Sequence, residues 1–436
     1  MIKAKIIADS KNPQGDRITT MEVTFPRFIL AEFNTHRMFS RNSASSRAIP
    51  FEKMVKSVQE NPCIPIAWQK DHKGMQGSEY ITDTLAIQNL NNQWLQGRDS
   101  VIKTAQNLNR GAYTLETSKD ENGNNMRGFI CVDIPDTQVT KQLCNRLLEP
   151  FMWHTVIVTA TEWENFFTLR CPKYSLFSEN MPLEFRSKKD MLKYVKSVEA
   201  DEFKNSYDNL TDLQWLQINK GQAEIHIMAL AEAMWDALNE SIPKQLKMGE
   251  WHIPYKTNIE DFRSSKYENL QSITTFNDVK IATARCARVS YTVAEELKPS
   301  EEWQKLYPDI VVLDPDGWDR EDFTNSWNEK ISLQEYEYRL VRSTCTGKLS
   351  SISPITSIRQ IEKDLELHDR LAQSGHWSPF EHCARAMTDV EYKTFYRGSL
   401  TKFKDKHDLI SIDGGWCYNF KGFIQYRYLQ NNNLID

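Results

Sequence analysis

The chain has 436 residues, which is enough to bury a large core and to form two or three domains. Its 54 lysines and arginines and 59 aspartates and glutamates leave a formal net charge of -5, so bulk charge does not favour nucleic acid and any anion site must be local. No apolar run is long enough for a membrane span, and residues 1–9 carry charges too early for a signal peptide, so a cytoplasmic location is expected.

The first predicted elements lead into a basic loop. Residues 18–25 alternate like a strand, and Pro26 opens a short helix over residues 27–33. Residues 35–47 then hold three arginines, a histidine, four serines and an asparagine. Guanidinium groups fork onto phosphate oxygens and small hydroxyls donate to the remaining lone pairs, so this composition indicates an anion site, with phosphate the leading ligand. A solvated surface loop has the same composition, but the preceding strand and buried helix would hold this one in place.

The rest of the chain favours an α+β fold with a substantial helical share. Apolar residues recur at helical spacing over residues 223–239, which indicates a core helix. The other predicted elements are helices over 80–118, 136–170 and 357–374, a turn-rich connector over 120–125, a charged insertion over 171–220 and an acidic loop over 307–327. The elements group into three parts, which are residues 1–240 with the basic loop and the insertion, a linker over 241–278, and a C-terminal part over 279–436.

The cysteines and histidines predict no metal site. Eight cysteines are scattered with no Cys-x-x-Cys pair, which argues against a zinc knuckle and a disulfide framework, and most are expected to be buried small hydrophobes. His382, which follows Phe380 closely, is expected to be a hydrogen-bonded structural residue. His72, His252 and His407 match no motif and are expected at the surface.

The basic loop resembles the signature of the flavin-dependent thymidylate synthases, which is Arg-His-Arg, seven residues and then Ser. His36-Arg37, seven residues and Ser45 match it, with Thr35 in place of the first arginine. Three further segments are similar to motifs of the same family, namely Arg146–Pro150 with Thr159–Arg170, Gly221–Ile225, and Ala287–Tyr291 with Gly375–His382.

The order of these segments resembles a circular permutation of the family. In the usual order, the segments that here begin at Ala287 and Gly375 precede the basic signature. Residues 25–32 and 419–427 both resemble the stretch that leads into that signature. The two ends of the chain are therefore expected to overlap in the fold.

The resemblance implies a flavin-dependent thymidylate synthase-like core with extra helical insertions. Such an enzyme would transfer a one-carbon unit from methylenetetrahydrofolate to C5 of a pyrimidine deoxynucleotide, dUMP by default, with FAD as cofactor, NADPH as co-substrate and a homo-oligomer as its assembly. Arg170 would be the catalytic residue that polarises the base, and its structural alternative is a helix-end salt bridge. The implied substrate-binding residues are Glu32, Ser43, Ser45, Ser46, Arg47 and Arg146. The implied cofactor-binding residues are His36, Arg37, Asn165, His376, Ser378 and Glu381.

The chain departs from the family pattern at positions that normally touch flavin or nucleotide. The replacements are Thr35 for arginine, Ser43 for glutamate, Glu32 for glutamine, Thr159 for asparagine and Thr161 for arginine. Arg41 or Arg427 would restore a lost cation.

These departures leave two alternatives open. One is a dCMP or dUMP hydroxymethylase or methylase of the same fold, because one altered hydrogen-bonding residue can reverse the choice between uracil and cytosine. The other, from a different class, is a non-catalytic nucleotide- or nucleic-acid-binding protein.

Overall fold

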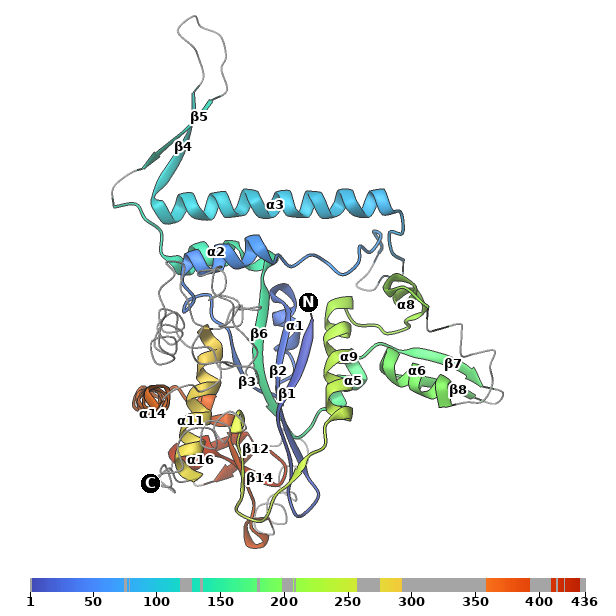
Figure 1. Cartoon of the computed structure of the whole chain (residues 1–436), viewed down its shortest axis with the longest axis vertical. Helices are drawn as coiled ribbons and strands as arrows, with labels where there is room; N and C mark the ends of the chain where they lie inside the picture. Colours follow the sequence, from blue (N-terminus) through green and yellow to red (C-terminus); the bar gives the residue numbers. More distant parts are fainter. Residues whose placement is uncertain are drawn as a thin grey trace, which may run out of the picture.

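The computed structural model describes residues 2–73, 77, 79–117, 128–133, 136–178, 181–197, 207, 209–256, 275–291, 358–392, 409–412, 415–418 and 420–431. Helices and mostly antiparallel sheets share this part of the chain, which confirms the α+β class (Figure 1). The predicted connector over 120–125 and the acidic loop over 307–327 lie outside the described residues. None of the helices in the described ranges is both long and apolar enough to cross a membrane.

A five-stranded sheet forms the centre of the molecule. Its strands are β1 (Lys3–Lys11), β2 (Arg17–Pro26), β3 (Ser40–Ser43), β6 (Trp153–Ala160) and β9 (Lys244–Gln245), in the order β3-β6-β2-β1-β9. The β1, β2, β6 and β3 pairings are antiparallel, and β9 runs parallel to β1. β2 confirms the strand predicted over 18–25. β3 lies within the predicted basic loop, so part of that loop is an edge strand.

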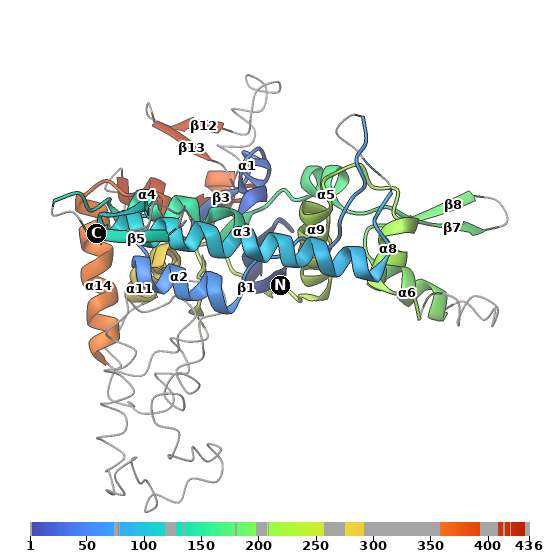
Figure 2. The same cartoon turned by 90° about the horizontal axis from the view of Figure 1, so that it is seen from above.

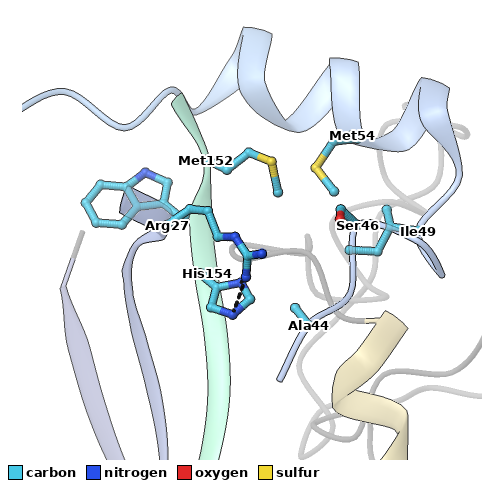
Figure 3. A pocket seen from close by; sticks show the side chains of 8 residues that line it. Arg27, Ala44, Ser46, Ile49, Met54, Met152 and His154 are labelled. Carbon is cyan, nitrogen blue, oxygen red and sulfur yellow. Dashed lines mark hydrogen bonds between the residues drawn. The ribbon is translucent and has the colours of Figure 1, made fainter. Parts of the chain in front are cut away.

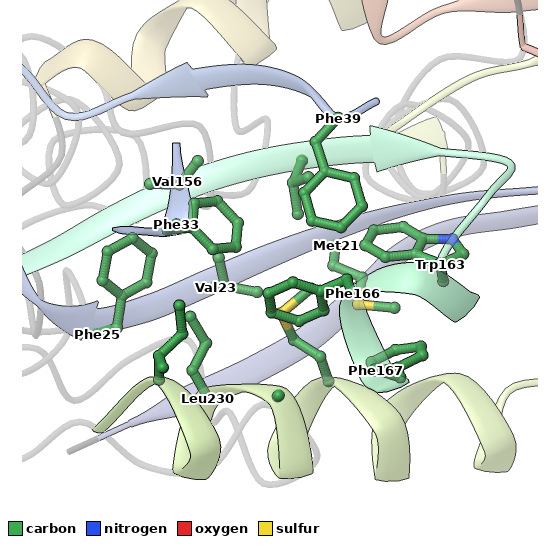
Figure 4. Packing of buried hydrophobic residues seen from close by; sticks show 14 of the residues in the cluster. Met21, Val23, Phe25, Phe33, Phe39, Val156, Trp163, Phe166, Phe167 and Leu230 are labelled. Atoms are coloured by element: carbon green, nitrogen blue, oxygen red, sulfur yellow. The ribbon is translucent and has the colours of Figure 1, made fainter. Parts of the chain in front are cut away.

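One face of the sheet is apolar and carries the main core. Because side chains alternate along a strand, Met21, Val23 and Phe25 of β2 share this face (Figure 4). The helices that cover it are α1 (Leu30–Phe33), which continues the 3-10 turn η1 (Arg27–Ile29), α5 (Glu164–Arg170) and α9 (Ile225–Glu240). α9 confirms the predicted core helix and buries Leu230 and Met234 here, at about 1.5–3 kcal/mol for each large side chain.

The opposite face of the same sheet carries buried polar side chains beside apolar ones such as Ile18 and Ile157. Thr20 and Glu22 of β2 and Thr159 of β6 lie on it, and all three are buried. Residues from the C-terminal half cover these groups, because His252 contacts Thr20 and the Tyr255 hydroxyl donates to Glu22 at 3.1 Å. The fold therefore places a polar layer between the central sheet and the C-terminal part.

A helical layer with its own core packs beside the sheet. It consists of α2 (Phe51–Glu60), α3 (Thr84–Arg110), α4 (Lys141–Leu147) and the 3-10 turn η2 (Glu149–Phe151), and Figure 2 shows α3 running across it. The hairpin of β4 (Ala112–Thr117) and β5 (Gly128–Asp133) follows α3. The helix predicted over 80–118 ends earlier, at Arg110, because Gly111 adopts a left-handed conformation that stops the helix.

The predicted insertion over 171–220 forms a separate small unit at the side of the molecule (Figures 1 and 2). Its described elements are β7 (Tyr174–Ser178), β8 (Met181–Phe185), α6 (Lys188–Ser197) and α8 (Asp212–Ile218). Tyr174, Met191 and Trp215 belong to a hydrophobic cluster of this unit. The insertion thus has a core of its own.

The C-terminal part contributes a second sheet and several helices. β10 (Trp251–His252), β11 (Ala384–Ala386) and β14 (Phe423–Gln425) form the sheet, and β12 (Leu409–Ile412) pairs with β13 (Gly415–Tyr418). The helical elements are α11 (Thr275–Arg288), η3 (Val289–Tyr291), α14 (Ile358–Gln373), η5 (Ser378–Glu381) and α16 (Tyr426–Asn431). α14 confirms the helix predicted over 357–374.

Three expectations need correction. The region 136–170 is not continuously helical, because its run from Thr155 to Thr159 is β-branched and forms the central strand β6. The described part of the linker supplies β9 and β10 and buries Leu246 and Ile253, so these residues belong to the sheets. The ends of the chain meet but do not coincide, because Ile18 and Phe423 share a cluster while β2 and β14 lie in different sheets.

Candidate functional site

Arg170 lies at the end of α5, where three motif residues meet. Its Nη1 pairs with the carboxylate of Glu32, and its Nε donates to Nε2 of His36 at 3.1 Å. Nη2 has no hydrogen-bond partner within the described part of the chain. The Arg170 side chain is 21% exposed, so a ligand can reach part of it while Nε and Nη1 are held. A guanidinium oriented in this way can donate to a ligand oxygen with little further loss of rotamer freedom.

His36 and Glu32 both have perturbed protonation equilibria. Burial, and then the charges of Arg170 and Arg41, lower the pKa of His36 to about 4, so the ring is neutral near pH 7. Its proton lies on Nδ1, since Nε2 accepts from Arg170. Burial raises the pKa of Glu32, against the opposing effect of Arg170. His36 therefore orients the guanidinium and adds no positive charge to the anion site expected from the basic loop.

A second pair of an acid and a histidine adjoins this cluster. The Glu224 carboxylate caps α9 by accepting the N–H groups of His226 at 2.8 Å and Ile227 at 3.1 Å. Nδ1 of His226 lies 2.5 Å from Glu224, and Nε2 accepts the N–H of Ile66 at 3.1 Å, so the ring carries its proton on Nδ1 and donates it to Glu224. The charge of Glu224 also raises the pKa of Glu32.

Glu224 and His226 were not among the predicted site residues. The available signal was the resemblance of residues 221–225 to a family motif, which contains Glu224 but assigns it no role.

The basic loop contacts the C-terminal motif that begins at Ala287. The Ser45 N–H donates to the Ser290 carbonyl at 3.0 Å, and the Asn42 amide donates to the Cys286 carbonyl at 2.7 Å. Ser40 accepts from Gln425 of β14 at 3.4 Å. Segments separated by more than two hundred residues are thereby assembled around β3.

Three arginines of the predicted site remain available to a ligand. Arg37, Arg47 and Arg146 are exposed and make no hydrogen bond or ion pair within the described residues. Asn145 donates to the carbonyls of Ser46 at 2.7 Å and Ile49 at 3.1 Å, so the helix that carries Arg146 packs on the turn that carries Arg47. The two unpaired cations lie on adjoining elements, which suits an anionic group.

The predicted serine contacts differ in access. Ser43 and Ser45 are half-buried, whereas Ser46 is only 9% exposed and lines a small pocket (Figure 3). In this pocket Arg27 donates to Nε2 of His154 at 3.0 Å, and burial together with Arg27 lowers the pKa of His154 to about 3. The cavity volume of about 10 Å³ leaves room for roughly one water molecule, so this pocket is too small for a nucleotide.

The residues implied as flavin contacts fit such a cofactor only in part. Arg37, Asn165, His376 and Ser378 are exposed and able to meet a ligand. Glu381 is buried, and its carboxylate already pairs with Arg427. Arg427 therefore neutralises Glu381 in this structure, and the exposed residues are the ones that a ligand could reach.

The structure agrees with some of the expectations for the histidines and contradicts one. His72 is exposed as predicted, and His407 lies outside the described residues. His252 was expected at the surface but is wholly buried, with Nε2 2.8 Å from Thr20 and Nδ1 2.9 Å from Ser10, because the segment after α9 returns into the fold. His382 is buried and bonded to Thr159, as expected of a structural residue.

The predictions about cysteines and metal sites can be compared with the described part of the chain. The five cysteines whose side chains are described are all free and buried. In the described ranges, no group of three or more His, Cys, Asp or Glu residues is arranged to hold a metal ion.

Comparisons with known proteins identify no family for this chain. No family model and no curated protein matches its sequence. One solved structure, the crystal structure of a UMP/dUMP methylase PolB from Streptomyces cacaoi bound with 5-Br dUMP, is similar over 51% of this chain and 67% of its own, with 12% sequence identity and a TM-score of 0.29. A likeness at this TM-score supports no conclusion about activity.

Proposed function

We propose that this protein transfers a one-carbon unit from methylenetetrahydrofolate to C5 of a pyrimidine deoxynucleoside monophosphate, with bound FAD and with NADPH as reductant. dUMP is the default substrate and dTMP the product. The observation that carries the proposal is the oriented guanidinium of Arg170. Glu32 and His36 of one motif hold Arg170 of another, across 138 and 134 positions of the sequence.

Arg170 would act on the pyrimidine base. Its Nη2 would donate to a ring carbonyl oxygen, where negative charge grows as C5 becomes nucleophilic. A fixed cation beside that oxygen stabilises the transition state more than the ground state. Glu32 and His36 would keep the guanidinium in place during the reaction, as they do in this structure.

The exposed cations would hold the phosphate groups. Arg47 and Arg146 lie on adjoining elements and would bind the nucleotide phosphate, while Arg37, His376 and Ser378 would contact the flavin. A bound flavin would supply the reducing equivalents that make the transferred carbon a methyl group. A homo-oligomer would complete the site with residues from a second copy.

Glu32 favours a second candidate of the same reaction class. A carboxylate here, in place of the family's glutamine, can accept either N3–H of uracil or the amino group of cytosine. dCMP is therefore the rival substrate. Without the reductive step, capture of the one-carbon unit by water would leave a hydroxymethyl product.

The test is mass spectrometry of the products formed with FAD, NADPH, methylenetetrahydrofolate and an equal mixture of dUMP and dCMP. A one-carbon adduct on either nucleotide would support the proposal, name the base and separate methyl from hydroxymethyl. If the protein retains flavin and binds nucleotide but forms no adduct, the enzymatic proposal fails and a non-catalytic nucleotide-binding protein is favoured.

A further inference from the structure

Five buried polar side chains form one unbranched chain of hydrogen bonds between the central sheet and the C-terminal part. Ser10 Oγ lies 2.9 Å from His252 Nδ1, and His252 Nε2 lies 2.8 Å from Thr20 Oγ1. Thr20 Oγ1 lies 2.7 Å from Thr159 Oγ1, which lies 2.8 Å from His382 Nδ1. Ser10 is 4% exposed and the other four are 0% exposed. The members come from β1, β10, β2, β6 and the residue after η5.

The chain of hydrogen bonds ends at His382. Nε2 of this ring is buried and has no hydrogen-bond partner in the part of the chain that the structure describes. His382 is also the last residue of the Gly375–His382 motif. Burial lowers the pKa of His382 to about 3 and that of His252 to about 4, which keeps both rings neutral near pH 7.

Neutral rings allow only two directions of donation along the chain. Each threonine hydroxyl has two partners here, so it donates to one and accepts from the other. If donation runs from Ser10 towards His382, both histidines carry their proton on Nε2. If it runs the other way, both carry it on Nδ1. The direction also decides whether His382 Nε2 is a hydrogen-bond donor or an acceptor.

We propose that these five residues form a proton wire, a chain of hydrogen bonds that reverses as a unit, and that it gives His252 and His382 the same tautomer. For the direction to reverse, solvent water supplies one proton to Nε2 of the Nδ1-protonated His382. His382 then gives its Nδ1 proton to Thr159, and each following group passes one proton on. The Ser10 hydroxyl releases the last proton to water, and every group is again neutral. The inference does not depend on the proposed one-carbon transfer.

The test is NMR of the full-length protein labelled with ¹⁵N-histidine, in which the ring nitrogen shifts report the tautomer. His252→Gln and His382→Gln assign the two rings by loss of signal. The wire predicts the same tautomer in both rings, or the same averaged population if the direction exchanges. Opposite tautomers or unequal populations would overturn it.

Thr159→Val tests the coupling between the rings. Valine has nearly the same shape but no hydroxyl, so Thr20 keeps only His252 Nε2 as an acceptor. His252 is then expected to carry its proton on Nδ1, whatever its form in the wild type, and an Nε2-protonated His252 would contradict the wire. Thr159→Ser should restore the wild-type shifts.

Thr155→Val is the matched control. Thr155 lies on the same strand, is buried and pairs with Thr24 at 3.3 Å outside the wire. Its loss should leave the nitrogen shifts of both rings unchanged. A change at His252 as large as that in Thr159→Val would assign the effect to general repacking of β6 and overturn the proposal.

Discussion

At the scale of single residues, the candidate site depends on how Arg170 is held. Its charge alone would not distinguish it from the other arginines of the chain. Contacts at Nε and Nη1 fix the plane of the guanidinium and leave Nη2 for a ligand. The proposed activity therefore requires the geometry of an arginine as well as its charge.

Arg170→Lys is expected to lower kcat/KM for the nucleotide about 100-fold, because an ammonium group cannot be oriented on one edge and donate from another. Steady-state kinetics on the active substrate measure the loss. Arg186→Lys is the matched control, since Arg186 pairs with Glu164 of the same helix and should stay within about twofold. Equal effects of the two substitutions would contradict the assigned role.

At the scale of elements, Glu224 connects the stability of α9 with the candidate site. Glu224→Ala removes the acceptor of two N–H groups at the start of this helix and the partner of His226. We expect a loss of about 1–2 kcal/mol in the free energy of unfolding, measured by chemical denaturation. Glu362→Ala, at an exposed position of α14, should change the stability by less than about 0.5 kcal/mol. If Glu224→Ala lost no more stability than Glu362→Ala, the contacts of Glu224 at the start of α9 would not be stabilising.

α11 and α14 share a buried charge cluster. Asp364 accepts from Arg288 Nε at 2.5 Å and lies 3.8 Å from Arg285, and all three side chains are buried. Asp364→Asn would remove the negative charge that faces two buried guanidinium groups, so we expect a loss of about 3–5 kcal/mol in the free energy of unfolding.

Glu79→Gln is the control for this prediction. It breaks the exposed Lys70–Glu79 pair and should cost less than about 1 kcal/mol in the same denaturation experiment. Similar losses in the two variants would show that burial does not set the strength of the α11–α14 cluster.

Elements with a clear local pattern were predictable. Residues 18–25 alternate, and residues 223–239 and 357–374 have helical spacing, so their structures follow from short-range sequence. β6 was missed because Val156, Ile157 and Val158 are buried on both faces and show no alternation. β1 was not predicted, and its place in the sheet depends on pairing with β2.

At the scale of the whole molecule, the buried histidines make the free energy of unfolding depend on pH. The pKa values of His36 and His252 fall to about 4, and those of His154 and His382 to about 3. Each folded value lies below the ordinary value of 6.5, so the unfolded chain binds more protons below that pH. The corresponding stability is complete above pH 6.5 and is lost as the pH falls.

His154→Gln isolates one of these contributions. Between pH 6 and pH 4, the wild-type free energy of unfolding should fall by about 1.4 kcal/mol per pH unit more than that of the variant. The wild type must be compared with the variant because other groups also change stability with pH. Burial raises the pKa of Glu232 to about 7, so its contribution to the free energy of unfolding is lost as the pH rises, which is the opposite direction. Parallel pH profiles of the two proteins, measured by denaturation, would contradict the assignment.

The sequence by itself determined the α+β class, the regular elements with strong periodicity, and the resemblance that singled out Arg170, His36 and Glu32. These features depend on residue type and short spacing, which the chain displays directly. Only the tertiary structure decided that Glu32 pairs with Arg170, that His36 is neutral, and that His252 is buried. Pairing, burial and the resulting pKa depend on neighbours that lie more than a hundred residues away in the sequence, and only packing brings them within hydrogen-bonding distance.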